Sequence, residues 1–163
     1  MFYDGLGSLS GNVRGFEVVS DEYKKHPKVN ILLPTRSDNR SAGYDFYSPV
    51  DIRITPGKRC LVWTDVKAYM QENEVLMLYV RSSIGVKKGV VLSNGTGIID
   101  SSYYSNPDND GNIGISLFNT SDKEVHILAG ERIAQGVFIQ YLVADNDEVL
   151  NKERSGGFGS SGK

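Results

Sequence analysis

The stretch NGTGIIDSSYY, residues 94–104, contains the residues whose types and spacing best suit chemistry. Asp100 follows two isoleucines, where an unpaired carboxylate is costly unless it has a function. Gly95 and Gly97 bracket a tight hairpin whose backbone could approach a flat ligand closely. Tyr103 adds an aromatic ring to the same candidate site.

A second stretch, RSSIG (81–85), combines groups that suit a phosphate. Arg81 supplies a cation, Ser82 and Ser83 supply hydroxyls, and the start of a helical turn supplies free backbone N–H groups. A capped surface turn would need the serines but not the arginine. On this stretch alone, a phosphate cradle and a surface turn both remain open.

Two more stretches have an ordinary interpretation beside a functional one. In SAGYDFYS (41–48), Asp45 follows a small pair of residues, which is also a common way for a strand to begin. In AGERIAQGVF (129–138), Arg132 and Gln135 stand at the start of a strand. An arginine there is usually a salt-bridged surface residue.

The stretch ERSGGFGSSGK (153–163) is rich in glycine and serine, which is typical of a linker. A passive linker has no use for the apolar ring of Phe158 or the bidentate cation of Arg154. On this stretch alone, a disordered terminal tail is still the better interpretation. The residues before it, 1–152, are expected to form a single β domain, of which 1–25 includes a leader.

Composition limits the class of protein. The chain has 163 residues, of which 39% are hydrophobic and 23% charged, and a formal net charge of −2. This is typical of a globular protein and argues against general nucleic-acid or membrane-surface binding. The single cysteine, Cys60, fits a reducing compartment, and no apolar run is long enough to span a bilayer. We therefore expect a cytoplasmic protein without a membrane partner or stable nucleic-acid binding.

The sequence contains no convincing motif for a protein-held metal ion or for a catalytic nucleophile. The stretch NPDNDG (106–111) resembles the start of a calcium loop, but Leu117 stands where a bidentate glutamate is needed. A polar hairpin is the better interpretation. Two histidines and one cysteine suggest neither a zinc cluster nor a Cys/His or Ser/His/Asp triad.

The dominant hydrophobic period is two residues, which predicts strands. Segments with this pattern or with apolar runs are separated by turn signals and lie at 50–55, 75–80, 113–118, 123–128 and 137–143. The helical candidates are short and lie at 21–25, 65–70 and 82–88. Many short strands at near-regular spacing predict an all-β fold, a jelly-roll-like β-barrel or sandwich with at most one or two short helices.

Taken in order, SAGYD, RSS, GIIDSSY, RIAQ and GGFGSSG resemble the motifs of the homotrimeric dUTP pyrophosphatase (dUTPase) family. The match runs from about Val29 to Gly162. The resemblance implies hydrolysis of dUTP to dUMP and pyrophosphate by Mg²⁺-assisted attack of an Asp-activated water on the α-phosphorus. This reaction limits uracil in DNA and supplies dUMP for dTMP synthesis. The resemblance also implies a homotrimer with shared active sites. It further implies that residues 153–163 form a flexible C-terminal arm that closes over an active site.

The resemblance further implies a role for each motif residue. Asp100 would orient and deprotonate the attacking water, and Tyr103 would lie against the deoxyribose. Asp45 would meet the Mg²⁺ through water and take part in a subunit contact. The remaining residues would hold the base and sugar (Asn94, Gly95, Gly97, Ile99 and Phe158) or the phosphates (Arg81, Ser82, Ser83, Gln135, Arg154, Ser160 and Ser161).

Two features depart from the family pattern. The hairpin after Tyr103 contains the extra stretch SNPDND (105–110), and Ser155 alone separates Arg154 from the double glycine. Two other functions stay open as alternatives. A dCTP deaminase of the same superfamily would need a catalytic glutamate where GIIDSSY stands. A nucleotide-gated binding protein would regulate a protein partner through the extra hairpin.

Overall fold

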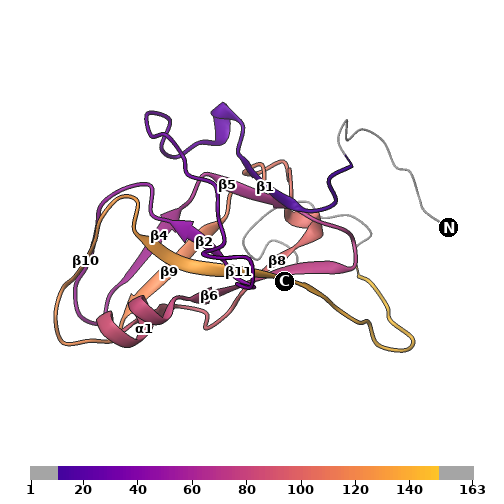
Figure 1. The fold of residues 1–163 in the computed structure, drawn as a ribbon. Helices are drawn as coiled ribbons and strands as arrows, with labels where there is room; N and C mark the ends of the chain where they lie inside the picture. The colour runs from indigo at the N-terminus through magenta and orange to yellow at the C-terminus, as the bar shows by residue number, and fades with distance from the viewer. Residues whose placement is uncertain (1–10, 151–163) are drawn as a thin grey trace.

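The computed structural model describes residues 11–150, which form small antiparallel sheets (Figure 1). The largest sheet contains, in order, β2 (Tyr44–Tyr47), β11 (Arg132–Gln140), β6 (Glu74–Val80) and β8 (Gly97–Asp100). A three-stranded sheet contains β4 (Arg59–Trp63), β9 (Gly114–Asn119) and β7 (Val90–Leu92). Two strand pairs complete the described fold: β1 (Gly15–Val18) with β5 (Val66–Tyr69), and β10 (Val125–Ile127) with β3 (Ile52–Ile54).

The strands bury alternate side chains in one hydrophobic cluster. In β9, Ile115 and Leu117 are buried while Gly114, Ser116 and Phe118 are partly exposed, as the two-residue period predicts. β6 is buried along most of its length because it lies between β11 and β8. The largest fully buried apolar side chains are Phe46, Leu76, Ile113, Ile115, Leu117, Ile127 and Ile133. The predicted all-β class is confirmed.

The described residues contain one short α-helix, α1 (Ser82–Lys88), and two 3₁₀ turns, η1 (Asp21–Tyr23) and η2 (Ser101–Tyr103). α1 ends at Gly89, whose φ of 66° is the left-handed conformation that glycine adopts readily. The prediction of a helical turn at 82–88 is confirmed. None of the helices in the described part of the chain is long and apolar enough to cross a membrane.

The helix predicted at 65–70 is wrong. Residues Val66–Tyr69 form β5, which pairs with β1 in the register Val18 opposite Val66. Within the strand, Val66 and Ala68 are buried while Lys67 and Tyr69 are only partly buried, so the segment follows a strand period. Packing against β1 decides the structure here, as often happens for short segments with mixed propensity. β1 also gives the described part of the predicted leader a defined position in the fold.

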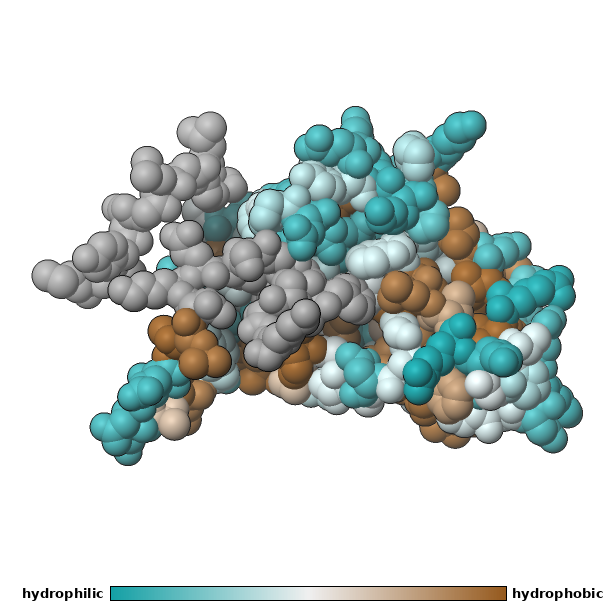
Figure 2. Space-filling model, turned by 180° about the vertical axis from the view of Figure 1, so that it is seen from behind, coloured by the Kyte–Doolittle hydropathy of each residue, from teal (hydrophilic) through white to brown (hydrophobic). Residues whose placement is uncertain are grey.

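Beyond β11, residues 141–150 leave the body of the molecule as a projecting segment, drawn in yellow in Figure 1. Its apolar side chains are largely exposed, with Leu142 at 97% and Leu150 at 95% of full exposure. Figure 2 shows brown hydrophobic residues at the base of this projection. In a single chain this segment therefore leaves apolar surface uncovered.

Candidate active site

Asp45 joins three of the sequence motifs in space. It lies in β2 and is only 4% exposed. Arg81 Nε lies 3.1 Å from Asp45 Oδ1, and Arg132 Nη1 lies 3.4 Å from Asp45 Oδ2. Ser37 also donates a 3.2 Å hydrogen bond to Oδ2. The charge of the buried carboxylate is thus compensated by two guanidinium groups, as a buried charge requires. Asp45, Arg81 and Arg132 form one charged cluster.

Gln135 lies beside this cluster because of strand register. It stands opposite Asp45 on β2 and opposite Tyr79 on β6. A Cβ atom at Gly43 would lie 2.5 Å from Gln135 Oε1, closer than real contacts allow. Glycine at position 43 therefore leaves the space that the Gln135 side-chain amide occupies.

The start of α1 presents the two serines of the second motif. Arg81 is the N-cap residue, and its carbonyl accepts hydrogen bonds from Ile84 N (3.0 Å) and Gly85 N (2.8 Å). Ile84 is buried and anchors the helix, whereas Ser82 and Ser83 are exposed. The first N–H groups of an α-helix have no partner within the helix, so this turn offers donors as well as hydroxyls.

A separate cavity of about 200 Å³ lies over β8 and η2. Of the residues predicted to hold the base and sugar, Asn94, Gly97, Ile99 and Tyr103 line it. Ile98 of the same motif also lines it, together with Leu78, Leu92, Gly114, Ile115 and Ser116, which belong to none of the motifs. The cavity is mostly apolar with a few convergent polar groups, which is typical of a small-molecule site.

The hairpin at residues 94–97, which borders this cavity, makes a tight turn. Gly95 has a φ of 75° and donates a 3.0 Å hydrogen bond from its N–H to the Leu92 carbonyl. At Gly97, a Cβ atom would lie 3.0 Å from Leu78 Cβ, so a side chain would press on the facing strand. Both glycines are thus needed for the backbone to lie along the cavity.

Asp100 and Tyr103 differ in their exposure. Asp100 is the last residue of β8, opposite Val75 on β6, and it is exposed in the single chain. The sequence suggested that Asp100 bears the free-energy cost of a carboxylate in apolar surroundings. In the single chain this cost does not arise, because the side chain is exposed. Tyr103 is 5% exposed, and its hydroxyl donates a 2.7 Å hydrogen bond to the Asn112 carbonyl.

The structure therefore contains two groups of predicted residues. One group, around Asp45, contains Arg81 and Gln135, and the other surrounds the cavity next to Asp100. Arg132, for which the sequence favoured a salt-bridged surface position, joins the first group through its ion pair with Asp45. Within residues 11–150, no group of three or more His, Cys, Asp and Glu side chains gathers as a metal site. The predicted arm residues Arg154, Phe158, Ser160 and Ser161 lie outside the described residues.

Residues 30–162 match the dUTPase family. The chain belongs to this family. It is 50% identical to the deoxyuridine 5′-triphosphate nucleotidohydrolase of Lactococcus lactis subsp. lactis over 151 residues, which cover 92% of this chain and 98% of that protein. The activity of the chain is accordingly that of a dUTP diphosphatase.

Solved structures agree with this assignment. The crystal structure of dUTPase from Streptococcus mutans is similar with a TM-score of 0.71 and 45% identity, and the match covers 80% of this chain and 98% of that one. The Staphylococcus bacteriophage 80alpha dUTPase G164S mutant with dUpNHpp is similar with a TM-score of 0.67 and 25% identity, over 93% of this chain and 99% of that one. The predicted family, fold class and enzyme class are confirmed.

Proposed function

We propose that the chain converts dUTP and water to dUMP and pyrophosphate by attack of an Asp100-activated water on the α-phosphorus. The observation that carries this proposal is the cavity lined by Asn94, Gly97, Ile99 and Tyr103, with Asp100 at the end of the strand that forms one wall. A nucleotide whose base and sugar fill the cavity would bring its α-phosphate toward Asp100. One carboxylate would suffice as base, since the leaving pyrophosphate needs no strong acid.

Base selection follows from the hairpin at 94–97. Fixed backbone N–H and C=O groups, together with the Asn94 side chain, would pair with the edge of uracil. Cytosine would leave these groups unmatched, and a site built for hydrogen bonding can reject such an analogue by about 10⁴-fold. A methyl group at carbon 5 would meet the backbone near Gly97, which already lies close to Leu78.

Sugar selection follows from Tyr103. Its ring lines the cavity and is almost fully buried. We propose that it lies against the deoxyribose and occupies the space of a ribose 2′-hydroxyl. Substrate binding of this kind is supported by the solved 80alpha dUTPase, which carries dUpNHpp.

The phosphates would bind the second group of residues. Arg81 is oriented by Asp45, and Ser82 and Ser83 are exposed at the start of α1. Gln135, in the space left by Gly43, would reach a phosphate oxygen or the water beside it. Charge-assisted hydrogen bonds of this kind are the stronger ones, and they neutralise a substrate that carries several negative charges. Arg154, Ser160 and Ser161 of the arm would add contacts to the terminal phosphates, and Phe158 would stack on the uracil.

The residues present fit Mg²⁺ held mainly by the triphosphate. Both Asp45 oxygens already have ion-pair partners, yet a carboxylate has about four acceptor positions, so it can also accept from a metal-bound water. When bound, Mg²⁺ would neutralise the phosphates and stabilise the leaving pyrophosphate. Asp45 would thus act through water while it holds Arg81 in place.

We also propose a homotrimer with shared active sites and a cytoplasmic role in limiting uracil in DNA and supplying dUMP. The exposed apolar residues Leu142, Val143 and Leu150 support a subunit contact at the projecting segment. The arm, residues 153–163, would complete the site by excluding bulk water.

Pyrophosphate release from dUTP, dCTP and UTP tests the function directly. We expect rapid release from dUTP and far slower release from the other two nucleotides. Ammonia release from dCTP would instead indicate a deaminase. Tight nucleotide binding without any product would indicate a regulatory binding protein, and either result would overturn the proposal.

A further inference from the structure

The loop that contains the extra stretch 105–110 holds the hydroxyl of Tyr103. Asn109 Nδ2 donates a 2.8 Å hydrogen bond to the Tyr103 oxygen, which itself donates a 2.7 Å hydrogen bond to the Asn112 carbonyl. The Tyr103 hydroxyl therefore accepts a hydrogen bond from one residue of the loop and donates a hydrogen bond to another. Because both bonds are directional, they fix the tilt of the ring that lines the cavity.

The Asn109 amide is itself held in one orientation. Its Oδ1 accepts hydrogen bonds from Gly111 N (3.1 Å) and from Asn106 Nδ2 (2.7 Å). A flipped amide would oppose donor to donor at both contacts, so the NH₂ group must point at Tyr103. Asn106 also donates a 2.9 Å hydrogen bond to the Tyr103 carbonyl, which ties the loop to the backbone of the same residue.

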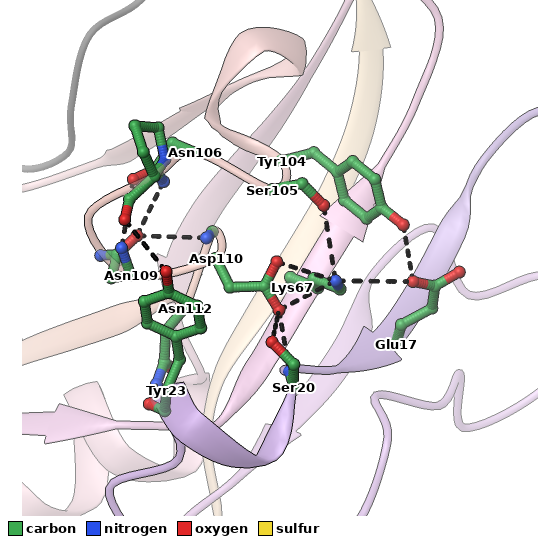
Figure 3. A network of polar contacts seen from close by, with 12 residues as sticks. Glu17, Ser20, Tyr23, Lys67, Tyr104, Ser105, Asn106, Asn109, Asp110 and Asn112 are labelled. Carbon is green, nitrogen blue, oxygen red and sulfur yellow. Dashed lines mark hydrogen bonds and ion pairs between the residues drawn. The ribbon is translucent and has the colours of Figure 1, made fainter.

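An outer network attaches the loop to the body of the molecule (Figure 3). Asp110 accepts from Lys67 Nζ at 3.0 Å on both oxygens, and from Ser20 N at 2.8 Å. Lys67 lies 4.8 Å from the centre of the Tyr104 ring, and the Tyr104 hydroxyl donates a 2.7 Å hydrogen bond to Glu17. These partners belong to the loop, to β5, and to β1 and the residues just after it, so the loop is fixed from several directions.

Two titratable groups of this network have shifted pKa values. Burial, and then the hydrogen bond donated to Glu17, raise the pKa of Tyr104 to about 12. Burial alone would raise the pKa of Asp110, but the hydrogen bonds from Ser20 and Lys67 outweigh it and leave the pKa below its ordinary value. Near neutral pH, Tyr104 is therefore protonated and Asp110 is ionised.

We propose that Asn109 is a positioning residue for Tyr103, and that the 105–112 loop thereby sets the discrimination of deoxyribose from ribose nucleotides. This rests on the proposed contact of Tyr103 with the sugar. A flat apolar wall rejects an added hydroxyl by only about 10²-fold, because the wall can yield. A ring held at its hydroxyl by two hydrogen bonds cannot tilt away, so the loop would supply the rigidity that stronger discrimination needs.

The test compares kcat/KM for dUTP and for UTP in three variants of the full chain. Asn109→Ala removes the donor, and Asn109→Asp removes the donor while it keeps the Oδ1 acceptor for Gly111. We expect both to lower the dUTP-to-UTP ratio at least about tenfold, chiefly by raising kcat/KM for UTP, with kcat for dUTP within about threefold of the wild type. The matched control is Asp108→Asn, an exposed position in the same loop, which should leave the ratio unchanged.

The outcomes separate this inference from the proposed function. An unchanged ratio in both Asn109 variants would overturn the positioning role while dUTP hydrolysis stands. A wild-type protein that does not prefer dUTP over UTP would overturn the proposed sugar contact itself. If the Asn109 variants lose more than about 5 °C in Tm, Tyr103→Phe provides the same test, because it keeps the ring and removes only the anchored hydroxyl. That variant should also lower the ratio, and an unchanged ratio would refute the anchor.

Discussion

Asp45 and Asp100 lie on the two edge strands of the largest sheet, β2 and β8, with β11 and β6 between them. The register sets Asp45 level with Tyr79 of β6 and Asp100 level with Val75. The two aspartates are three strand spacings apart across the sheet and four residues apart along the strands. Together these place them about 20 Å from each other. The Arg81 group and the Asp100 group therefore cannot meet on one α-phosphate within a single chain.

This separation predicts complementation between subunits. Arg81→Ala and Asp100→Asn should each be nearly inactive alone, because each removes an essential half of every site. If a site takes Arg81 from one subunit and Asp100 from another, co-expressed and randomly mixed trimers should recover about a quarter of the wild-type kcat. Activity of purified mixed oligomers measures this, with the homogeneous variants as controls. No recovery in oligomers shown to be mixed, or a monomer mass in light scattering, would contradict shared sites.

Replacement of Asp100 by asparagine should separate chemistry from binding. The change removes the proposed base and leaves the phosphate ligands, so kcat for dUTP should fall by about 10²-fold or more. The Kd for dUpNHpp, measured by calorimetry, should stay within about tenfold of the wild type. Asp108→Asn makes the same chemical change at an exposed carboxylate and should leave both quantities unaltered. Retention of more than about a tenth of kcat in Asp100→Asn would remove Asp100 from the role of base.

Two buried carboxyls should make the fold sensitive to acid. The hydrogen bond from Arg14, which outweighs burial, lowers the pKa of Glu74 below its ordinary value, and the pKa of Asp110 is lowered as well. In acid the unfolded chain then binds more protons than the folded one. The stabilisation is thus complete above the unfolded-state pKa of about 4 and is lost as pH falls through the folded-state values.

Urea unfolding of the wild type and of Asp110→Asn at pH 7 and pH 3.5 measures this effect. Position 110 has a φ of 57°, which asparagine tolerates, so the variant keeps the backbone and loses the Lys67 ion pair. We expect the free energy of unfolding of Asp110→Asn to be about 1–2 kcal/mol below that of the wild type at pH 7. At pH 3.5 the difference between the two proteins should be smaller. An equal difference at both pH values would show that Asp110 does not contribute through its charge.

The sequence predicted the local backbone structure around two motifs because turn and helix-start signals are local. Gly95 has the left-handed φ that its NG turn suggests, and RSSIG begins a helical turn as expected. Contacts between distant positions could not be predicted. Arg132 meets Asp45 across 87 positions, and β5 becomes a strand only because β1 pairs with it.

The polar loop after Tyr103 shows the same limit. Asn106 and Asn109 are typical turn residues, so the sequence predicted a polar hairpin here and no contact with Tyr103. Their contacts with Tyr103 depend on the folded path of the loop, in which Gly111 lies against the Tyr103 carbonyl. The role of such residues follows from geometry, because no spacing in the sequence distinguishes an anchoring amide from an ordinary turn.

Gly43 gives a prediction that concerns a single methyl group. In Gly43→Ala the new Cβ would lie 2.5 Å from Gln135 Oε1 and 3.3 Å from its Cβ, so the amide must move. If Gln135 holds a phosphate or the nearby water, kcat for dUTP should fall by about tenfold or more, since small misplacements of positioning groups are costly. The fold should survive, because Gln135 is only partly buried and its side chain can rotate toward solvent. Gly11→Ala, where a Cβ meets nothing within 4 Å, is the matched control and should retain full activity. Wild-type kcat in a folded Gly43→Ala protein would show that the position of Gln135 does not matter for the reaction.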